Sequence, residues 1–253
     1  MGRAAQGIPV TVWLDAAGRC FNPTPSVSVV RIAPGQVCIV VDDALAWPEG
    51  LVDWAANQPF ELPSGFPYPG LIRAAPEALA PRVLEQFTGH ARRPLGARRT
   101  LDYFVRLSLA TLPPNLLAPE QWQCHRDRLA EDPQRVIYAA MVLYLFRNSA
   151  LGGTSFYQPR QPAVATDRLL AESRTLAPGE FRDRYGVPPG YMIDSNQYFE
   201  RIAQVPAAWN RMIFYDGGQF HSADIAAPNL LSADARTGRL TLNGFFACSR
   251  NVR

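Results

Sequence analysis

The chain contains only three histidines, His90, His125 and His221, and one of them begins a pattern that could bind a metal. Asp127 follows His125 by two positions. In an extended segment, side chains at i and i+2 point to the same face, so an imidazole nitrogen and a carboxylate oxygen can reach one small cation. Alone, the pair is a weak signal, because a chain of this composition contains a His-x-Asp by chance roughly one time in seven. A surface loop without a ligand is the alternative.

His221 is a candidate third ligand. It follows an apolar stretch that ends at Gly217 and Gly218, where a strand would turn. Two imidazoles and one carboxylate make a facial set of three donors, which leaves three coordination positions open and suits non-haem Fe(II). The alternative for His221 is a histidine at a strand end that is bonded to a nearby backbone carbonyl.

A later alternating segment carries polar and apolar side chains on opposite faces. Arg239, Thr241 and Asn243 share one face, and Leu240 and Leu242 share the other. A buried guanidinium is costly unless it is paired. A dicarboxylate ligand would pair with it, because guanidinium binds carboxylate through two parallel hydrogen bonds. Exposure of this face to solvent is the alternative.

The surrounding sequence indicates which elements position these residues. A β-branched apolar run predicts a buried strand over residues 36–43, and helices are predicted from Pro48 onward and over residues 76–87. From about residue 98, repeated short strands separated by turn signals indicate a sandwich or barrel. We expect one domain, residues 1–253, with an N-terminal α/β section at 1–97 and an all-β core at 98–253. The strands are expected at residues 100–112, 135–146, 154–157, 197–204, 210–216 and 238–248.

The order of several loose motifs carries a resemblance to a known superfamily. These motifs are Val37–Asp43 with the following helix, His125-x-Asp127, Val142–Leu145 with Gly152-Gly153-Thr154-Ser155-Phe156-Tyr157, Ile213-Phe214 before His221, and Arg239-x-Thr241. In this order they resemble the 2-oxoglutarate/Fe(II)-dependent dioxygenases, in particular the prolyl-4-hydroxylase-like branch. The ending Leu242-Asn243-x-Phe245-Phe246 suggests a separate bacterial subfamily. The resemblance implies a mainly β fold with flanking helices, built on a double-stranded β-helix (jelly-roll, cupin-like) core.

The resemblance also implies the roles of the site residues. It makes His125, Asp127 and His221 the ligands of Fe(II), and it makes Arg239, helped by Thr241, the residue that binds the far carboxylate of 2-oxoglutarate. An oxygenase of this kind consumes O₂ and the keto acid, releases succinate and CO₂, and hydroxylates an unactivated C–H bond. Related halogenases have Gly or Ala in place of the carboxylate, so Asp127 favours hydroxylation.

The sequence leaves the roles of several residues and segments unassigned. The resemblance does not choose between Tyr103 and Tyr138 as an additional contact for the cosubstrate. Residues 226–236 are expected to form an inserted loop. The segments 59–70 and 158–190 are long enough to act as lids over an active site.

Composition narrows the classes of partner. The chain has 253 residues and a formal net charge of +3, and all 25 basic residues are Arg. This charge is too small and too scattered for a nucleic-acid binder. The four cysteines are widely spaced, no apolar run is long enough to span a membrane, and no secretory signal is visible. We therefore expect a cytoplasmic protein, with its oligomeric state open. The resemblance to the dioxygenases implies a substrate such as an amino acid, a peptide or a small metabolite, without choosing among them.

Two other functions are compatible with the same residues. A cupin-like metalloprotein would use the same ligands without a keto acid, and binding of 2-oxoglutarate would exclude it. A non-catalytic scaffold or sensor would keep the fold and the metal but release no succinate.

Overall fold

A computed structural model describes residues 13–127, 132 and 134–250. The α-helices are α1 (Pro48–Ala56), α2 (Ala80–Gln86), α3 (Ala163–Ser173) and α4 (Pro178–Tyr185), and a single π-helical turn, η2 (Phe87–Ala91), extends α2. The strands are β1 (Ser26–Ala33), β2 (Gln36–Asp42), β3 (Gly70–Ala74), β4 (Ala97–Ala110), β5 (Val136–Tyr144), β6 (Thr154–Pro159), β7 (Phe199–Val205), β8 (Met212–Asp216), β9 (Phe220–Ala223) and β10 (Arg239–Arg250).

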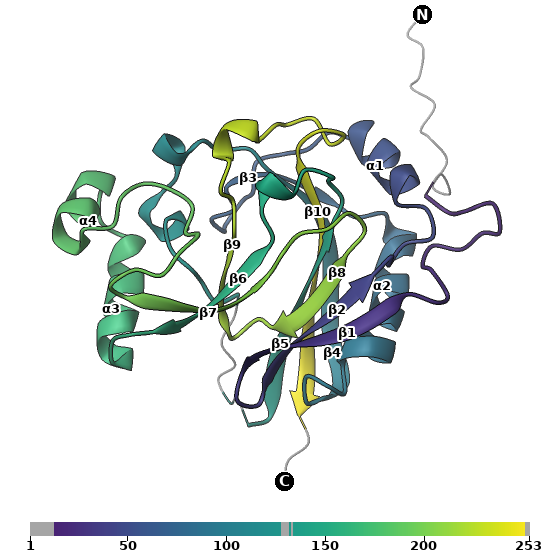
Figure 1. The fold of residues 1–253 in the computed structure, drawn as a ribbon, viewed down its shortest axis with the longest axis horizontal. Coiled ribbons are helices and arrows are strands. Elements are labelled where there is room, and N and C mark those ends of the chain that lie inside the picture. The colour runs from purple at the N-terminus through teal and green to yellow at the C-terminus, as the bar shows by residue number, and fades with distance from the viewer. Residues whose placement is uncertain (1–12, 128–131, 133, 251–253) are drawn as a thin grey trace, which may run out of the picture.

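The fold is mostly β, with two antiparallel sheets and a few helices (Figure 1). Within the described residues, the larger sheet has the order β1-β2-β8-β5-β10-β4-β3, and the smaller sheet has the order β7-β6-β9. The coarse prediction of a mainly β chain with flanking helices is confirmed. The first three strands lie at the two edges of the larger sheet, so residues on both sides of position 97 build it together.

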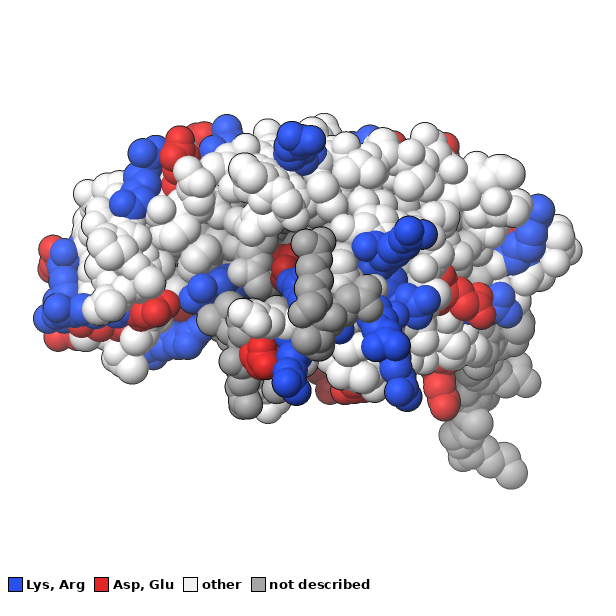
Figure 2. Space-filling view, turned by 90° about the horizontal axis from the view of Figure 1, so that it is seen from below, with Lys and Arg blue, Asp and Glu red and all other residues white. Residues whose placement is uncertain are grey.

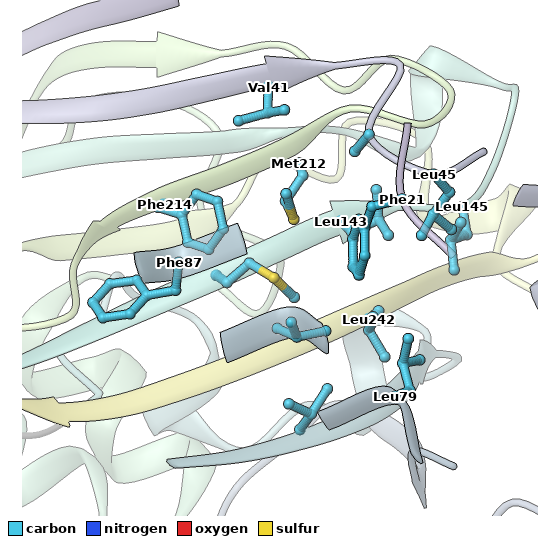
Figure 3. Packing of buried hydrophobic residues seen from close by; sticks show 14 of the residues in the cluster. Phe21, Val41, Leu45, Leu79, Phe87, Leu143, Leu145, Met212, Phe214 and Leu242 are labelled. Carbon is cyan, nitrogen blue, oxygen red and sulfur yellow. The ribbon is translucent and has the colours of Figure 1, made fainter. Parts of the chain in front are cut away.

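The alternation expected on the last strand determines which face of the larger sheet is apolar. Leu240, Leu242 and Phe246 of β10 are fully buried in a core shared with β5, β8, α1 and α2. Figure 3 shows Leu242 in this core together with Leu143 of β5 and Phe214 of β8. Phe87 of η2 stacks on Phe246 with ring centroids 4.1 Å apart, and it also contacts Phe214 of β8. Because side chains alternate along a strand, the polar residues of β10 point to the opposite face.

That opposite face meets the smaller sheet. Between the two sheets, Tyr144 of β5, Phe156 of β6 and Tyr215 of β8 belong to a second apolar cluster. The hydroxyl groups of Tyr144 and Thr154 lie 2.8 Å apart, so the tyrosine is hydrogen-bonded although it is fully buried. Beyond this cluster the sheets separate around a cavity.

Two segments differ from the sequence prediction. Residues 158–190 contain α3 and α4 instead of an extended loop, and β3 begins at the end of the predicted loop 59–70. The two helices were missed because residues Pro162 and Ala177 precede them, and neither side chain can cap a helix. Each helix buries one apolar side chain, Leu169 or Phe181, in a third cluster.

The surface mixes charges of both signs. Figure 2 shows basic and acidic side chains interspersed on the face below the view of Figure 1, with a group of basic side chains near its centre. Among the described residues, several arginines pair with carboxylates, for example Arg250 with Asp216 at 3.2 Å. No helix in the described part of the chain has the length and apolar character needed to cross a bilayer.

Candidate metal centre

Backbone pairing brings two of the predicted ligands together. The N–H of His125 donates to the carbonyl of His221 at 2.9 Å, and the N–H of His221 donates to the carbonyl of His125 at 2.9 Å. This exchange is an isolated antiparallel bridge between the segment before Asp127 and strand β9. Residues directly opposite in such a bridge place their side chains on the same face. The two imidazole ring centroids are accordingly 4.5 Å apart.

Asp127 completes a cluster of three donors. Its Oδ1 atom lies 3.6 Å from the Nε2 atom of His125 and 3.6 Å from the Nε2 atom of His221. Ligand atoms from the three residues all lie within 4.8 Å of one another. Neighbouring donors around a divalent ion with bonds of about 2.1 Å are roughly 3 Å apart, so small side-chain movements suffice to enclose one. The donor set fits the facial arrangement expected for iron.

Hydrogen bonds orient two of these side chains. Nδ1 of His221 lies 2.8 Å from the carbonyl oxygen of Gln219, which assigns the proton to Nδ1 and leaves the Nε2 lone pair for a metal. The backbone N–H of Asp127 donates to the carbonyl of Gly217 at 2.9 Å. Both orienting carbonyls belong to the turn that joins β8 to β9, so this turn positions a histidine and an aspartate at once.

Gly217 is required by the close approach of Asp127. A Cβ atom at this position would lie 3.0 Å from the Asp127 Oδ2 atom and 3.0 Å from the backbone oxygen of Tyr138. The absence of a side chain therefore lets the carboxylate lie against the turn.

The three groups shift one another's pKa values. Burial alone would raise the pKa of Asp127, but attraction to the nearby His221 and His125 imidazoles outweighs it and holds this pKa well below its usual range. For His221, burial is outweighed by the charge of Asp127, and the pKa is raised. Burial of the His125 ring and the charge of the nearby His221 both lower the pKa of His125, although 55% of the His125 side chain is exposed. The carboxylate is thus ionised and ready to bind a cation.

The cluster opens into a cavity of about 1120 Å³ between the sheets. Arg239 and Thr241 line the same cavity, as do Tyr103 and Tyr138. The structure therefore brings every site residue predicted from the sequence to one space.

Arg239 is more constrained than the sequence suggested. Its Nε donates to the carbonyl of Leu151 at 2.8 Å, and its Nη2 donates to those of Gly152 and Gly153 at 3.2 Å. The side chain is buried. Two of its three nitrogens are thereby used, so the expected pair of parallel bonds to a carboxylate is not available. Nη1 has no hydrogen-bond partner among the described residues and is the nitrogen left for a ligand.

The Gly152-Gly153 step allows this arrangement. Gly152 has φ +82°, and a Cβ atom there would lie 1.7 Å from the backbone oxygen of Asp224. At Gly153 a Cβ atom would lie 2.1 Å from the backbone oxygen of Val205. Only glycine fits such approaches, and the resulting backbone path presents successive carbonyls to Arg239.

Tyr68 was missed by the sequence reasoning. It lines the cavity, and its hydroxyl is buried without a hydrogen-bond partner in the described part of the chain. Burial raises the pKa of Tyr68, while the charges of Arg239 and Arg106 and the nearby hydroxyls of Ser108 and Thr241 act in the opposite direction. An unpaired buried hydroxyl beside a guanidinium fits an anionic ligand between them.

Cys124 directly precedes the candidate ligand His125 in the sequence. It is fully buried and free, and burial raises the pKa of its thiol well above the usual value. A protonated, enclosed thiol is a poor nucleophile, so Cys124 acts in packing beside the site.

The sequence matches the model of a family of unknown function, DUF6445, over residues 23–246. The chain belongs to this family. The matched span of this DUF6445 member includes the three clustered donors, together with Tyr68, Arg239 and Thr241. No curated protein matches the chain.

Several solved structures are similar to this DUF6445 protein. HygX from Streptomyces hygroscopicus, with nickel and 2-oxoglutarate bound, has a TM-score of 0.41 and 12% identity, covering 85% of this chain and 83% of its own. A Pseudomonas putida prolyl-4-hydroxylase has a TM-score of 0.35 and 13% identity, covering 80% and 86%. EvdO2 from Micromonospora carbonacea var. aurantiaca, complexed with 2-oxoglutarate, has a TM-score of 0.40 and 11% identity, covering 90% and 94%. Structural similarity at this level does not assign an activity to this chain, so its function must be inferred from its own residues.

Proposed function

We propose that this protein is an Fe(II)- and 2-oxoglutarate-dependent oxygenase, built on a double-stranded β-helix core, that hydroxylates a C–H bond. The observation that carries the proposal is the convergence of His125, Asp127 and His221 in a cavity that also contains Arg239. Nε2 of each histidine is 3.6 Å from the same carboxylate oxygen. Three donors on one side of an ion leave positions for a bidentate keto acid and for O₂.

In this proposal, the metal centre supplies oxidative decarboxylation of 2-oxoglutarate coupled to hydroxylation of the substrate, with release of succinate and CO₂. The protein's own residues hold and orient the reactants. The carbonyl of Gln219 keeps the proton of His221 on Nδ1, and the carbonyl of Gly217 holds the backbone of Asp127. The aromatic ring of Tyr215, 4.7 Å from the His221 ring between centroids, packs against this ligand on a buried side.

The far carboxylate of the keto acid is assigned to the end of the cavity near Arg239. Nη1 of Arg239 and the Tyr68 hydroxyl are the donors without protein partners, and Thr241 lies beside them. Hydrogen bonds to a charged group are stronger than those between neutral groups, so a carboxylate is the ligand that best satisfies these donors.

The size of the cavity favours two small molecules at once. Pockets for one small ligand usually have volumes of about 300–1,000 Å³. A volume of about 1120 Å³ leaves space for a substrate beside a five-carbon keto acid. An amino acid, a peptide side chain or a small metabolite would fit this description.

Anaerobic addition of Fe(II) and 2-oxoglutarate to the metal-free protein tests the proposal. We expect a visible absorption band near roughly 500–530 nm, which iron–keto-acid complexes show, followed by succinate formation when O₂ is admitted with a substrate panel. Iron binding without the band would favour a cupin-like metalloprotein that does not use the keto acid. The band without succinate, with every substrate, would favour a non-catalytic scaffold or sensor.

A further inference from the structure

One arginine that lines the cavity has neither an ion-pair partner nor a hydrogen-bond acceptor among the described residues. The arginines that line it are Arg106, Arg126, Arg174 and Arg239. Two form ion pairs, Arg126 with Asp167 at 3.3 Å and Arg174 with Glu120 at 3.7 Å. Arg239 donates to three backbone carbonyls. The side chain of Arg106 forms no ion pair and no hydrogen bond with any described residue.

Aromatic rings surround Arg106 instead. Its guanidinium carbon lies 4.2 Å from the ring centroid of Phe66, 5.1 Å from that of Phe245 and 5.8 Å from that of Tyr68. Phe104, a half-exposed residue of the same strand, stacks on Phe245 with centroids 4.6 Å apart. All of these rings line the cavity. They hold the guanidinium plane in place and exclude water from its faces.

Ring faces do not satisfy the N–H groups of a guanidinium. Nε of Arg106 is buried without a partner, and neither terminal nitrogen donates to another described residue. Two terminal N–H groups in one plane match the two oxygens of a carboxylate. A rigid, partly buried guanidinium of this kind is typical of a site for a planar anion.

Arg106 and Arg239 extend from different places on the cavity wall, and the ring of Tyr68, whose hydroxyl is assigned to the keto acid, lies 5.8 Å from the Arg106 guanidinium carbon. In the β4–β10 register, Arg106 is opposite Asn243, whereas Arg239 is opposite Ala110. Four residues along a strand correspond to roughly 13 Å. Arg239 lies against the buried ring of Phe146, while Arg106 lies against the partly exposed Phe66, toward solvent.

We propose that Arg106 binds a carboxylate of the primary substrate, with Phe104 and Phe245 contacting the apolar part of the same molecule. The substrate class is then an organic acid with an apolar or aromatic body. This inference depends on the proposed function in one respect: it takes the acid bound at Arg106 to be the molecule that the enzyme hydroxylates.

Matched pairs of ligands test the proposal. The full-length protein, both metal-free and loaded with Zn(II), is titrated with 3-phenylpropanoate, N-acetylphenylalanine and linear acids of five to ten carbons, each beside its primary amide. In the metal-free wild-type protein, we expect at least one acid to bind ten-fold or more tightly than its amide. Arg106→Gln should remove this preference, and Arg106→Lys should retain part of it. Arg99→Gln, which alters an exposed arginine of β4, should keep it in full.

Three outcomes would overturn the inference. The first is that no acid binds better than its amide in the wild-type protein. The second is that the preference survives in Arg106→Gln. The third is that Arg106→Gln, but not Arg239→Gln, loses 2-oxoglutarate binding in the Zn(II)-loaded protein, which would make Arg106 the cosubstrate residue. Because the preference is measured without metal, failure of the metal centre would leave this result intact.

Discussion

His125 and His221 exchange both of their backbone hydrogen bonds, so the candidate metal centre is built into the pairing of the chain. Two candidate ligands that are far apart in the sequence are held in fixed register. Asp127, two residues after His125, is secured by one more backbone bond to Gly217. The distances among the three side chains are therefore set by the β structure before any ion binds.

Loss of the carboxylate should abolish turnover. Asp127→Ala removes the oxygen that both imidazoles approach and leaves only two donors. We expect Fe(II)-dependent succinate formation to fall below detection, measured with the substrate that gives the highest wild-type rate. Retention of wild-type turnover would remove Asp127 from the ligand set.

Crowding the carboxylate should weaken metal binding without removing a ligand. In Gly217→Ala, the new methyl group lies 3.0 Å from the Asp127 Oδ2 atom and displaces it. Altering a group that orients a ligand typically costs about 10–100-fold in metal affinity, and we expect an effect in that range by titration with Co(II). Gly218→Ala is the control, because its methyl group contacts only the side chain of Asp216 and should leave the affinity unchanged. Equal affinities for the two variants would contradict the role of this turn.

Metal affinity should rise with pH. The pKa of His221 is raised and that of His125 is lowered. At about pH 6.5, which is the ordinary pKa of a histidine side chain, His221 is therefore mostly protonated and His125 is mostly neutral. A metal must displace the proton of His221, and binding at this pH should release about one proton. Below this pH, protonation of His125 as well should steepen the loss of affinity. Calorimetry in buffers of different ionisation enthalpy measures the released protons, and a value near zero would exclude His221 as a ligand.

Removing the Tyr68 hydroxyl should affect the keto acid and spare the fold. This hydroxyl has no hydrogen-bond partner in the described residues, so Tyr68→Phe should leave the free energy of unfolding unchanged or slightly increased. A hydrogen bond to a carboxylate contributes about 1.5–3 kcal/mol, and the KM for 2-oxoglutarate should rise about tenfold or more.

Arg239→Ala provides the comparison for Tyr68→Phe. We expect a larger rise in the same KM together with a lower Tm, because three backbone carbonyls lose their donor. An unchanged KM in both variants would move the cosubstrate carboxylate to another part of the cavity.

Local patterns were sufficient to predict much of the β structure. The alternation of Leu240 and Leu242 with Arg239 and Thr241 follows from the two-residue period of a strand, and the structure buries the leucines in the main core. The strand at β2 and the helix beginning at Pro48 follow equally from composition. Helices α3 and α4 could not be predicted in this way, because each buries only one apolar side chain and neither has a capping residue at its start.

The candidate site was predictable only where residue type was informative. Histidines are so rare in this chain that His125 and His221 drew attention by themselves. Tyr68 and Arg106 carry no such signal, because tyrosines and arginines are common here. Their importance comes from packing between distant segments, which leaves a hydroxyl and a guanidinium unpaired in the cavity. The use of Arg239 by backbone carbonyls likewise depends on the path of the Gly152-Gly153 turn.

The most direct test of the metal centre is a crystal structure of the protein with Mn(II) and 2-oxoglutarate, using anomalous scattering to locate the ion. We predict one strong peak within about 2.3 Å of Nε2 of His125, Nε2 of His221 and a carboxylate oxygen of Asp127. A peak at another location, or none at full Mn(II) saturation, would contradict the account.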